Sequence, residues 1–202
     1  CTLCGKCAEA CPTKAIEMSG KLYDVEELMQ IIERERVHIE HSDGGVTFSG
    51  GEPLMHPDFL IDMLKACKEK GLHCAVDTCG FASTETLLEV AKHTDLFLYD
   101  LKMMDSKLHR KWTHVGNSIL LKNLELLADT GVPIIIRIPL IAHINDTQEN
   151  IENTAAFISK LGGEPKEVHL LPYHSIAQHK YAKLGRADEF GKLQEPDKNT
   201  LQ

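Results

Sequence analysis

Apolar residues recur with two alternating periods along most of the chain. Longer segments place an apolar side chain every three or four positions, which is typical of amphipathic helices. Short runs of β-branched and aromatic residues between them are typical of strands. Five helices are predicted, beginning near Asp24, Pro57, Ser83, Ile119 and Asp146. Five strands are predicted, over residues 46–49, 73–77, 96–100, 134–138 and 168–171.

Polar residues at the helix starts and apolar stripes along the helices support this assignment. Asp24 with Glu27, and Asp146 with Glu149, have the spacing of capping boxes, in which each pair closes the first turn of a helix. The residues expected to face inward are Leu60, Met63, Leu64 and Cys67 in the helix from Pro57, and Leu87, Leu88 and Ala91 in the helix from Ser83.

Strands that alternate with helices predict right-handed βαβ units and a parallel sheet, and hence an α/β fold. Five strands are too few for a closed barrel of eight, so we expect a partial parallel (β/α) barrel, with an open doubly wound sheet as the alternative. We divide the chain into residues 1–20, which lack helical periodicity, a barrel over residues 21–185, and a polar tail over residues 186–202.

Composition then narrows the functional classes. Hydrophobic residues make up 43% and charged residues 26% of the 202 residues, as in ordinary globular domains. The formal net charge of −8 argues against a nucleic-acid-binding protein, which needs clustered Lys and Arg. The longest apolar stretch, residues 132–144, is interrupted by Pro133, Arg137 and Pro139, so we expect no membrane span.

Four cysteines lie near the start of the chain, at Cys1, Cys4, Cys7 and Cys11, and a proline follows the last. The spacing C-x2-C-x2-C-x3-C-P is that of bacterial ferredoxins, in which three thiolates bind one 4Fe–4S cluster and the fourth binds a neighbouring cluster. Zinc is the alternative metal, but zinc sites usually combine two separated pairs, and no second pair is present. We therefore predict four 4Fe–4S ligands and a reducing, cytoplasmic location.

The neighbouring cluster would need three further thiolates. Cys67 and Cys74 fall on a helix core and a strand, where we expect buried core residues, and the role of Cys79 is open. A second ferredoxin motif upstream of Cys1 is the simpler source. We therefore expect residues 1–20 to be the C-terminal part of a ferredoxin-like insert, and the chain to be a piece of a longer protein.

Polar residues stand at the carboxyl ends of the predicted strands. They are Ser49-Gly50-Gly51-Glu52, Asp77-Thr78, Asp100-Leu101-Lys102, Arg137 and His174. Parallel strands end at one edge, so these groups are expected to share a face that could hold a zwitterionic ligand. Structural alternatives are helix caps for Asp77 and Asp100, a surface charge for Lys102 and an ordinary polar role for His174. Arg137 interrupts an apolar run, and a buried Arg requires a partner.

Five short segments together resemble one protein family. They are V-T-F-S-G-G-E-P-L (46–54), D-T-C-G (77–80), Y-D-L-K (99–102), R-I-P (137–139) and L-L-P-Y-H (170–174). In this order they look like the activating enzymes of glycyl radical enzymes, which are radical S-adenosylmethionine (SAM) proteins of the pyruvate formate-lyase activating type. The resemblance runs from residue 1 to about Gly185 and implies an incomplete (β/α)6 barrel of five to six strands.

The resemblance also implies a reaction and a site. In such enzymes a reduced 4Fe–4S cluster donates an electron to SAM, and the resulting 5′-deoxyadenosyl radical abstracts a hydrogen from a glycine of a partner enzyme. The SAM-binding residues it implies are Gly50, Gly51 and Glu52 for the methionyl amino group, Asp77, Asp100, Leu101 and Lys102 near SAM and a monovalent cation, and Arg137 and His174 at the later strand ends.

Three departures from the family pattern limit this assignment. The Asn of D-T-N-G is Cys79 here, and S-G-G-G-V-T is S-D-G-G-V-T at residues 42–47. More seriously, the radical SAM signature C-x3-C-x2-C does not occur in the 202 residues. We therefore assign no catalytic residue within the chain, and expect the chain alone to bind SAM weakly and to form no radical.

The resemblance predicts the partners as well. They are a glycyl radical enzyme as protein substrate and a flavodoxin or ferredoxin as electron donor. We expect the protein to be a monomer in the cytoplasm of an anaerobic organism. From its charge and its apolar pattern we expect it to bind neither nucleic acid nor membranes. Two alternatives stay open. One is another radical SAM enzyme that acts on a peptide or a small molecule. The other is a ferredoxin-like electron carrier fused to a ligand-binding barrel.

Overall fold

A single parallel sheet organises the protein. The computed structural model describes residues 2, 4–18, 20–164, 166–174 and 193–196. The sheet has the order β1-β2-β3-β4-β5, and each strand pairs in parallel with the next one along the chain. The strands are β1 (Gly45–Phe48), β2 (His73–Thr78), β3 (Leu96–Asp100), β4 (Ile134–Leu140) and β5 (Glu167–Pro172). The predicted parallel α/β sheet of five strands is confirmed.

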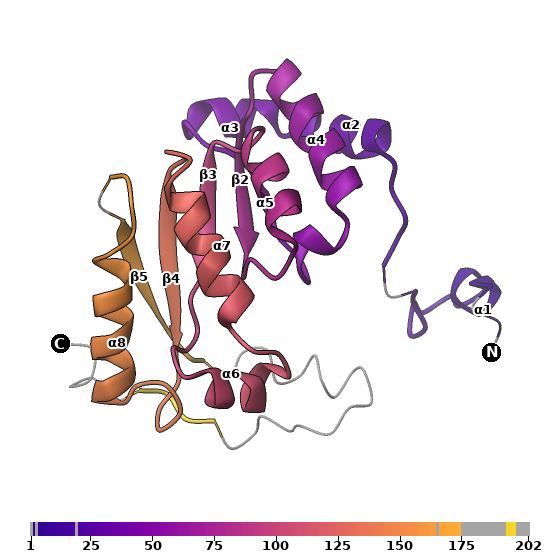
Figure 1. The fold of residues 1–202 in the computed structure, drawn as a ribbon. Coiled ribbons are helices and arrows are strands. Elements are labelled where there is room, and N and C mark those ends of the chain that lie inside the picture. Colours follow the sequence, from indigo (N-terminus) through magenta and orange to yellow (C-terminus); the bar gives the residue numbers. More distant parts are fainter. Residues whose placement is uncertain (1, 3, 19, 165, 175–192, 197–202) are drawn as a thin grey trace.

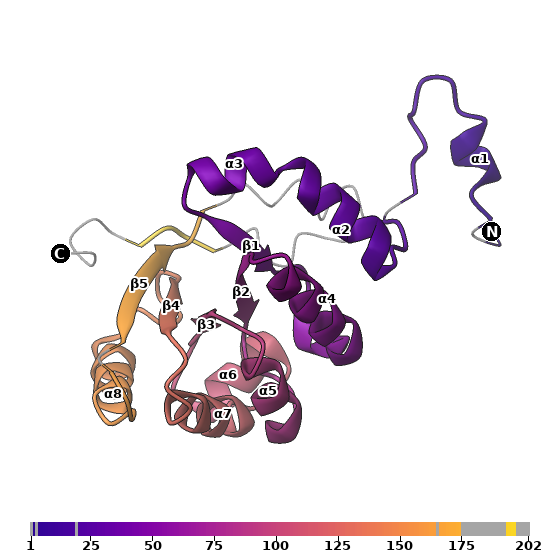
Figure 2. The same ribbon diagram turned by 90° about the horizontal axis from the view of Figure 1, so that it is seen from above.

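Helices precede and connect the strands along the chain. In chain order they are α1 (Lys6–Glu9), α2 (Val25–Arg34), α3 (Arg36–His41), the 3-10 helix η1 (Pro53–Met55), α4 (Pro57–Glu69), α5 (Thr84–Ala91), α6 (Ser106–Thr113), α7 (Ser118–Ala128) and α8 (Gln148–Ile158). Figure 2 looks along the strands and shows a curved sheet with α4, α5, α7 and α8 on its outer side. The curvature makes the sheet a partial barrel.

The hydrophobic core lies between the sheet and the outer helices. Successive strand residues point to opposite faces, so Val76, Phe97, Tyr99 and Ile136 face the helices, and none of the four has solvent exposure. They belong to one cluster with Met63, Leu64, Leu87, Leu124 and Leu127 of the outer helices. The intervening strand residues therefore face the concave side, where the strand-end polar groups lie.

Cys67 and Cys74 are part of this core, as predicted, and both are fully buried. The inward residues of α4 are also as predicted. In α5 the expected set is partly wrong: Leu87 and Ala91 are buried, but Val90 is buried where Leu88 was expected, and Leu88 is only half-buried. Leu87, Leu88, Val90 and Ala91 crowd into five consecutive positions, so their pattern alone does not fix which of them turns inward.

The two predicted capping boxes have different outcomes. Asp24 and Glu27 form the reciprocal box at the start of α2, with the backbone N–H of Glu27 donating to Asp24 Oδ1 at 2.8 Å. The predicted cap at Asp146 is wrong. Thr147 caps α8 by accepting from the backbone N–H of Asn150 at 3.3 Å, while Asp146 accepts from the backbone N–H of His143 at 2.7 Å in the preceding turn.

Helix α6 was not predicted because its sequence, S-K-L-H-R-K-W-T, lacks an apolar stripe. Asp105 caps it by accepting from the backbone N–H groups of Lys107 and Leu108. Its buried residue is His109, whose Nδ1 lies 2.8 Å from the backbone oxygen of Val115. Figure 1 places α6 below the carboxyl ends of the strands, which are at the bottom of the view.

The described residues near the start of the chain lie apart from the sheet, whereas those near its end contact the loop after β4. Residues 4–18, with α1, are drawn apart from the sheet in both views (Figures 1 and 2). Near the other end, residues 193–196 lie beside the loop after β4, where the backbone N–H of Ala142 donates to the backbone oxygen of Gln194 at 3.2 Å. Cys1 and most of the predicted tail, residues 186–202, lie outside the described residues. Within the described ranges, no helix combines the length and the hydropathy needed to cross a bilayer.

Candidate functional site

Residues from the carboxyl ends of four strands line one cavity of about 280 Å³. They are Ser49, Gly50, Gly51, Glu52, Asp77, Thr78, Cys79, Asp100, Lys102 and Arg137. The predicted gathering of strand-end polar groups is therefore what the fold produces, since parallel strands carry their carboxyl ends to the same edge. We refer to this cavity as the strand-end cavity.

Arg137 is the centre of a charged network in the strand-end cavity. Its guanidinium donates to Asp100 Oδ1 from Nε at 3.0 Å and from Nη2 at 2.8 Å, and Nη2 also donates to Asp77 Oδ1. Lys102 Nζ lies 3.2 Å from Asp100 Oδ2, and Ser49 Oγ donates to Asp77 Oδ2 at 3.1 Å. The network joins β2, β3 and β4 and the loop after β1.

Burial and charge act in opposite directions on the Arg137 guanidinium. Desolvation lowers its pKa, but the hydrogen bonds and negative charges of Asp100 and Asp77 outweigh desolvation and raise the pKa above its ordinary value. The guanidinium is therefore charged near neutral pH. Asp77 and Asp100 do not cap the following helices; Ser83 and Asp105 do.

Glu52 is held by four donors at the wall of the cavity. Its Oε1 accepts from Thr78 Oγ1 at 2.5 Å and from the backbone N–H of Leu54 at 3.2 Å. Its Oε2 accepts from the backbone N–H and from the thiol of Cys79, each at 3.0 Å. A carboxylate offers about four acceptor positions, so these donors fix both its position and its orientation.

Two glycines leave the backbone open on the other side of the cavity. Gly50 has a φ of 127°, a conformation that L side chains rarely adopt, and a Cβ added at Gly50 or Gly51 would meet no atom within 4 Å. A bound group can therefore approach the main chain of residues 50–51 directly.

Cys79, whose role the sequence left open, has its thiol in the cavity. Burial raises the pKa of this thiol to about 11, and the hydrogen bond to Glu52 and the charge of Glu52 add to the rise. The thiol is therefore protonated near neutral pH and acts as an S–H donor to the carboxylate. Ser49 and Thr78, which the sequence placed among the strand-end polar groups but not among the SAM-binding residues, also line the cavity.

Two predicted residues lie away from the strand-end cavity. The side chain of Leu101 is buried in the hydrophobic core, and its backbone N–H donates to the backbone oxygen of Arg137. His174 follows β5, is exposed and is not among the residues that line the cavity. His169 was not predicted, yet it pairs in register with Arg137 on the adjacent strand and lies 2.6 Å from Glu167. The alternation of side chains between the two faces of β5 could have indicated that His169 faces the same side of the sheet as Arg137.

The cysteine motif at the start of the chain stays a prediction. Cys4 and Cys7 are exposed and Cys11 is half-buried, and Cys1 lies outside the described residues. The backbone N–H of Lys6 lowers the pKa of Cys4, and the Thr13 side chain lowers the pKa of Cys11, so both thiols are biased toward the thiolate that metals bind. In the described part of the chain, no three His, Cys, Asp or Glu side chains are gathered for a metal ion.

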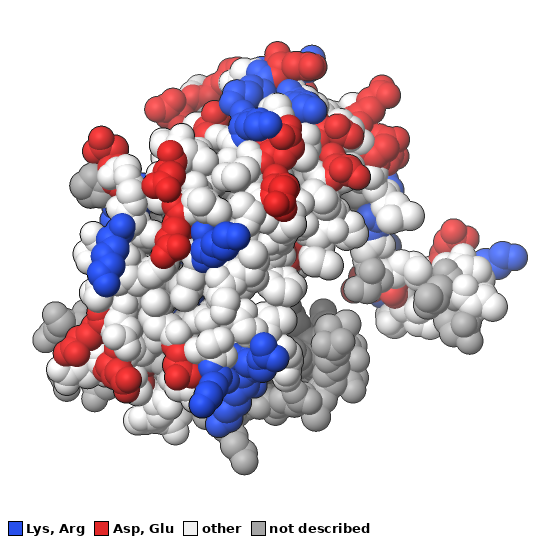
Figure 3. Space-filling view, viewed as in Figure 1, with Lys and Arg blue, Asp and Glu red and all other residues white. Residues whose placement is uncertain are grey.

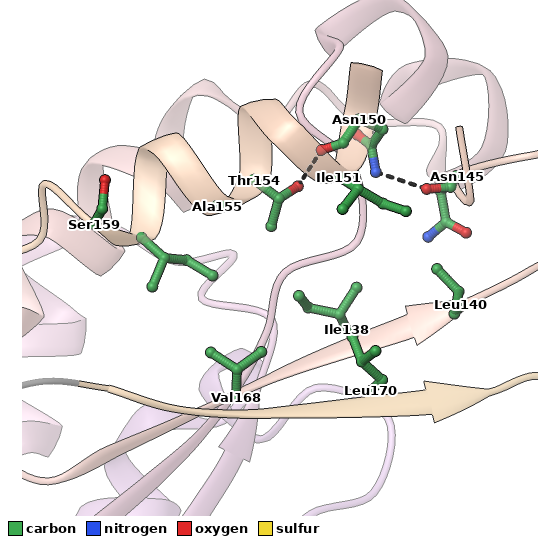
Figure 4. Close-up of a pocket in the computed structure, with 11 residues that line it drawn as sticks. Ile138, Leu140, Asn145, Asn150, Ile151, Thr154, Ala155, Ser159, Val168 and Leu170 are labelled. Atoms are coloured by element: carbon green, nitrogen blue, oxygen red, sulfur yellow. Dashed lines mark hydrogen bonds between the residues drawn. The ribbon is translucent and has the colours of Figure 1, made fainter. Parts of the chain in front are cut away.

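A second cavity, of about 420 Å³, lies between α8 and the outer face of β4 and β5 (Figure 4). Its walls include Ile138, Leu140, Val168 and Leu170. The dashed lines in Figure 4 show that its polar groups bond to one another: Thr154 Oγ1 donates to the backbone oxygen of Asn150, and the Asn150 amide donates to that of Asn145. This cavity offers no titratable group, so we do not assign the chemistry to it.

Comparison with known proteins agrees with this geometry. The family model of the radical SAM superfamily matches residues 7–158. A crystal structure of a domain of pyruvate-formate lyase-activating enzyme from Bacteroides vulgatus has a TM-score of 0.67 and 43% sequence identity, covering 79% of this chain and 89% of that one.

Curated relatives are similar over most of the chain. It is 42% identical over 234 residues to the trans-4-hydroxy-L-proline dehydratase activating enzyme of Clostridioides difficile, covering 100% of this chain and 77% of the relative. It is 40% identical over 186 residues to the (2S)-3-sulfopropanediol dehydratase activating enzyme of Klebsiella oxytoca, covering 92% of this chain and 59% of the relative. The chain therefore spans less than two thirds of the second relative.

Proposed function

The chain belongs to the radical SAM superfamily, among the activating enzymes of glycyl radical enzymes, and from this premise we propose that it is the SAM-binding part of an enzyme that installs a glycyl radical on a partner protein. Members of the superfamily use a 4Fe–4S cluster and SAM. The single observation that carries the proposal is the strand-end cavity, where five charged side chains meet beside an open Gly-Gly backbone.

The charges of the cavity fit the methionyl portion of SAM. Glu52, Asp77 and Asp100 are three acids and Lys102 and Arg137 are two bases, which gives the cavity a formal charge of −1. SAM carries two positive groups, the ammonium and the sulfonium, and one carboxylate, so its net charge is complementary. At about 280 Å³ the cavity is just below the range of about 300–1,000 Å³ for whole ligands, which suits the methionyl portion alone.

Each residue then has a physical role. The backbone of Gly50 and Gly51 lets the ligand approach closely, and the fixed carboxylate of Glu52 presents negative charge to the ammonium group. Lys102 Nζ, half-exposed beside Asp100, is placed to receive the ligand carboxylate. When bound, SAM and a reduced 4Fe–4S cluster supply the 5′-deoxyadenosyl radical that removes a hydrogen atom from the partner glycine.

We extend this proposal to the iron–sulfur ligands, His174, the monovalent cation and the electron donor, for which fewer observations are at hand. Cys4, Cys7 and Cys11 have the ferredoxin spacing and, with Cys1, would hold auxiliary 4Fe–4S clusters in a ferredoxin-like insert over residues 1–20. His174 would contact SAM from the end of β5. A monovalent cation would have to share Asp77 and Asp100 with Arg137, which already brings positive charge between them. A flavodoxin or ferredoxin would supply the electron to a cytoplasmic monomer.

The test uses the full-length protein, with its clusters reconstituted without oxygen. With dithionite and SAM we expect 5′-deoxyadenosine to form. With a glycyl radical enzyme such as trans-4-hydroxy-L-proline dehydratase, whose activating enzyme is a relative, we expect a glycyl radical in the electron paramagnetic resonance spectrum. SAM cleavage without radical transfer to this or any other glycyl radical enzyme tried would contradict the activating function, and would favour a radical SAM enzyme with a peptide or small-molecule substrate.

A matched pair of variants tests the cavity itself. Lys102→Met should raise the dissociation constant of SAM by about tenfold, since a charged hydrogen bond contributes about 1.5–3 kcal/mol. Lys122→Met, which removes an exposed lysine on α7, should leave it unchanged. Equilibrium dialysis of SAM without reductant measures both, independently of turnover. Equal affinities for the two variants would remove Lys102 from the site.

A further inference from the structure

A smaller cavity, of about 200 Å³, adjoins the strand-end cavity and shares Lys102 with it. Its walls are mostly apolar. They are formed by Met103, Trp112, Pro139, Ile141, Ile144 and Leu193. Any group seated there would lie beside the proposed SAM site, because the two cavities have one side chain in common. We refer to it as the Trp112 pocket.

The polar residues around the Trp112 pocket are already engaged in holding the protein together. The Asn145 amide donates to the backbone oxygens of Lys102 and Pro139, at 2.8 Å and 2.6 Å. Thr113 Oγ1 donates to the backbone oxygen of His109 at 2.8 Å, and His109 Nδ1 contacts the backbone oxygen of Val115. An occupant therefore meets apolar walls and an aromatic ring, and an apolar group fits them best.

The volume of the Trp112 pocket indicates whether a cofactor or a single side chain fits it better. Sites for small-molecule ligands usually enclose about 300–1,000 Å³, so a cavity of about 200 Å³ is small for a whole cofactor. One large apolar side chain inserted from another polypeptide fits this volume better. Binding between proteins concentrates at such pockets, where an aromatic residue and its apolar neighbours receive a single anchoring side chain.

The helix that carries Trp112 also carries a basic surface. Lys107, Arg110 and Lys111 are exposed on α6, the helix has no acidic residue, and Lys111 Nζ lies 5.4 Å from the centre of the Trp112 ring. Figure 3 shows Lys and Arg gathered at the lower part of the view, where Figure 1 places α6. This local basic group lies on a chain whose formal net charge is −8.

From these observations we propose that α6 and the Trp112 pocket form the docking surface for the partner protein. The partner inserts one apolar side chain, from the segment that carries its target glycine, into the Trp112 pocket, and acidic groups on either side of that segment face Lys107, Arg110 and Lys111. The proposal rests on the proposed function, because only a polypeptide substrate must bring a glycine to the strand-end cavity. It names which surface receives that polypeptide.

Trp112 makes the pocket observable, because it is the single tryptophan of the chain. In the full-length protein labelled with 5-fluorotryptophan, the ¹⁹F resonance that is lost in Trp112→Phe belongs to this ring. Addition of unlabelled trans-4-hydroxy-L-proline dehydratase should shift that resonance in a saturable way. The proposal would be overturned if the resonance does not shift when the partner is added. It would also be overturned if the resonance shifts with the concentration of the protein alone, because a second copy would then occupy the pocket.

Two variants test the surface through kinetics. Trp112→Ala should raise the KM for the partner by about tenfold, and Lys107→Gln combined with Lys111→Gln by about fivefold, with the second effect shrinking at high ionic strength. Neither variant should change the rate of SAM cleavage without partner, because none of the three residues lines the strand-end cavity. The control, Lys65→Gln combined with Lys122→Gln, removes two exposed lysines from α4 and α7 and should leave the KM unchanged.

The outcomes separate this proposal from the function on which it rests. If the wild-type protein forms no glycyl radical on any partner, the proposed function fails. If it forms the radical and both α6 variants show the KM of the control, the function stands and the docking surface is wrong. The paired lysine variant keeps the test decisive should Trp112→Ala fail to fold, since Lys107 and Lys111 are exposed.

Discussion

Arg137 shows how one side chain can organise a site. It interrupts the apolar strand Ile134–Leu140, and its side chain, only 20% exposed, reaches Asp100 and Asp77 on the two preceding strands. The expectation that a buried Arg needs a partner was correct, and the structure supplies two. Removal of Arg137 would leave Asp77 and Asp100 without the positive charge they share in a partly dry environment.

We predict that Asp100→Asn destabilises the protein by about 2 kcal/mol, since it removes charged hydrogen bonds from the side chain of Arg137. Urea denaturation should show a lower midpoint with an unchanged slope. Glu89→Gln is the matched control: Glu89 pairs with Lys92 at the surface, where both side chains are about half exposed or more, and its loss should cost less than about 0.5 kcal/mol. Equal costs for the two variants would mean that the network adds nothing to stability.

Cys79 departs from the family motif that the sequence resembles, but it keeps a hydrogen-bond donor at this position. The family motif has an amide-bearing Asn where this chain has a thiol, and both side chains can donate a hydrogen bond. Here the thiol donates to Glu52 at 3.0 Å, and its raised pKa of about 11 keeps the proton in place near neutral pH. The substitution was ambiguous in the sequence because the acceptor, Glu52, lies 27 positions away.

At the scale of single elements, the ends of helices were harder to predict than their existence. The sequence predicted the cap of α8 at Asp146, and the structure places it one residue later, at Thr147. The structure selects Thr147 because the turn before the helix uses Asp146: the backbone N–H of His143, which has a φ of 62°, donates to it. Neighbouring caps of this kind compete, and tertiary geometry decides between them.

We predict that Thr147→Ala lowers the free energy of unfolding by about 1 kcal/mol, because the backbone N–H of Asn150 loses its acceptor at the start of α8. Thr147→Ser keeps the hydroxyl and should restore most of this stability. Thermal or urea unfolding of the two variants measures the difference. If alanine and serine have the same effect, the cap at Thr147 contributes nothing and α8 is held by packing alone.

Helix α6 could not be predicted from the periodicity of apolar residues. It has few apolar residues, and what holds it is the cap at Asp105 and the buried His109, neither of which produces a hydrophobic pattern. The cap could have been recognised, since Asp followed by Ser and Lys is a suitable helix start. The consequence matters for function, because α6 carries the proposed docking surface.

At the scale of the whole molecule, the curved sheet has two edges within the described residues, β1 and β5. Near the β5 edge, Ile151, Val168, Leu170 and Leu171 are exposed by 38–48%, and three of them line or border the cavity beneath α8 (Figure 4). Apolar surface gathered in this way is uncommon on an isolated domain.

We predict that the β5 edge binds an apolar fluorescent dye such as ANS. Val168→Thr combined with Leu170→Thr should reduce the dye signal by at least about twofold, because both side chains line the cavity beneath α8. Val37→Thr on α3 is the matched control, since Val37 is 58% exposed and lies outside that cavity. An unchanged signal in the double variant would show that the dye, and hence the accessible apolar surface, lies elsewhere.

The sequence by itself determined the local and periodic features: five parallel strands, the stripes of their helices, the box at Asp24 and the polar residues that follow each strand. These depend on spacing and on the direction in which parallel strands run, so they can be read along the chain. Only the tertiary structure decided that Arg137 bridges Asp77 and Asp100, that Glu52 is held by Thr78 and Cys79, and that Trp112 lines a pocket beside Lys102. Those contacts join residues far apart in sequence, and they exist only once packing has fixed which side chains share a face.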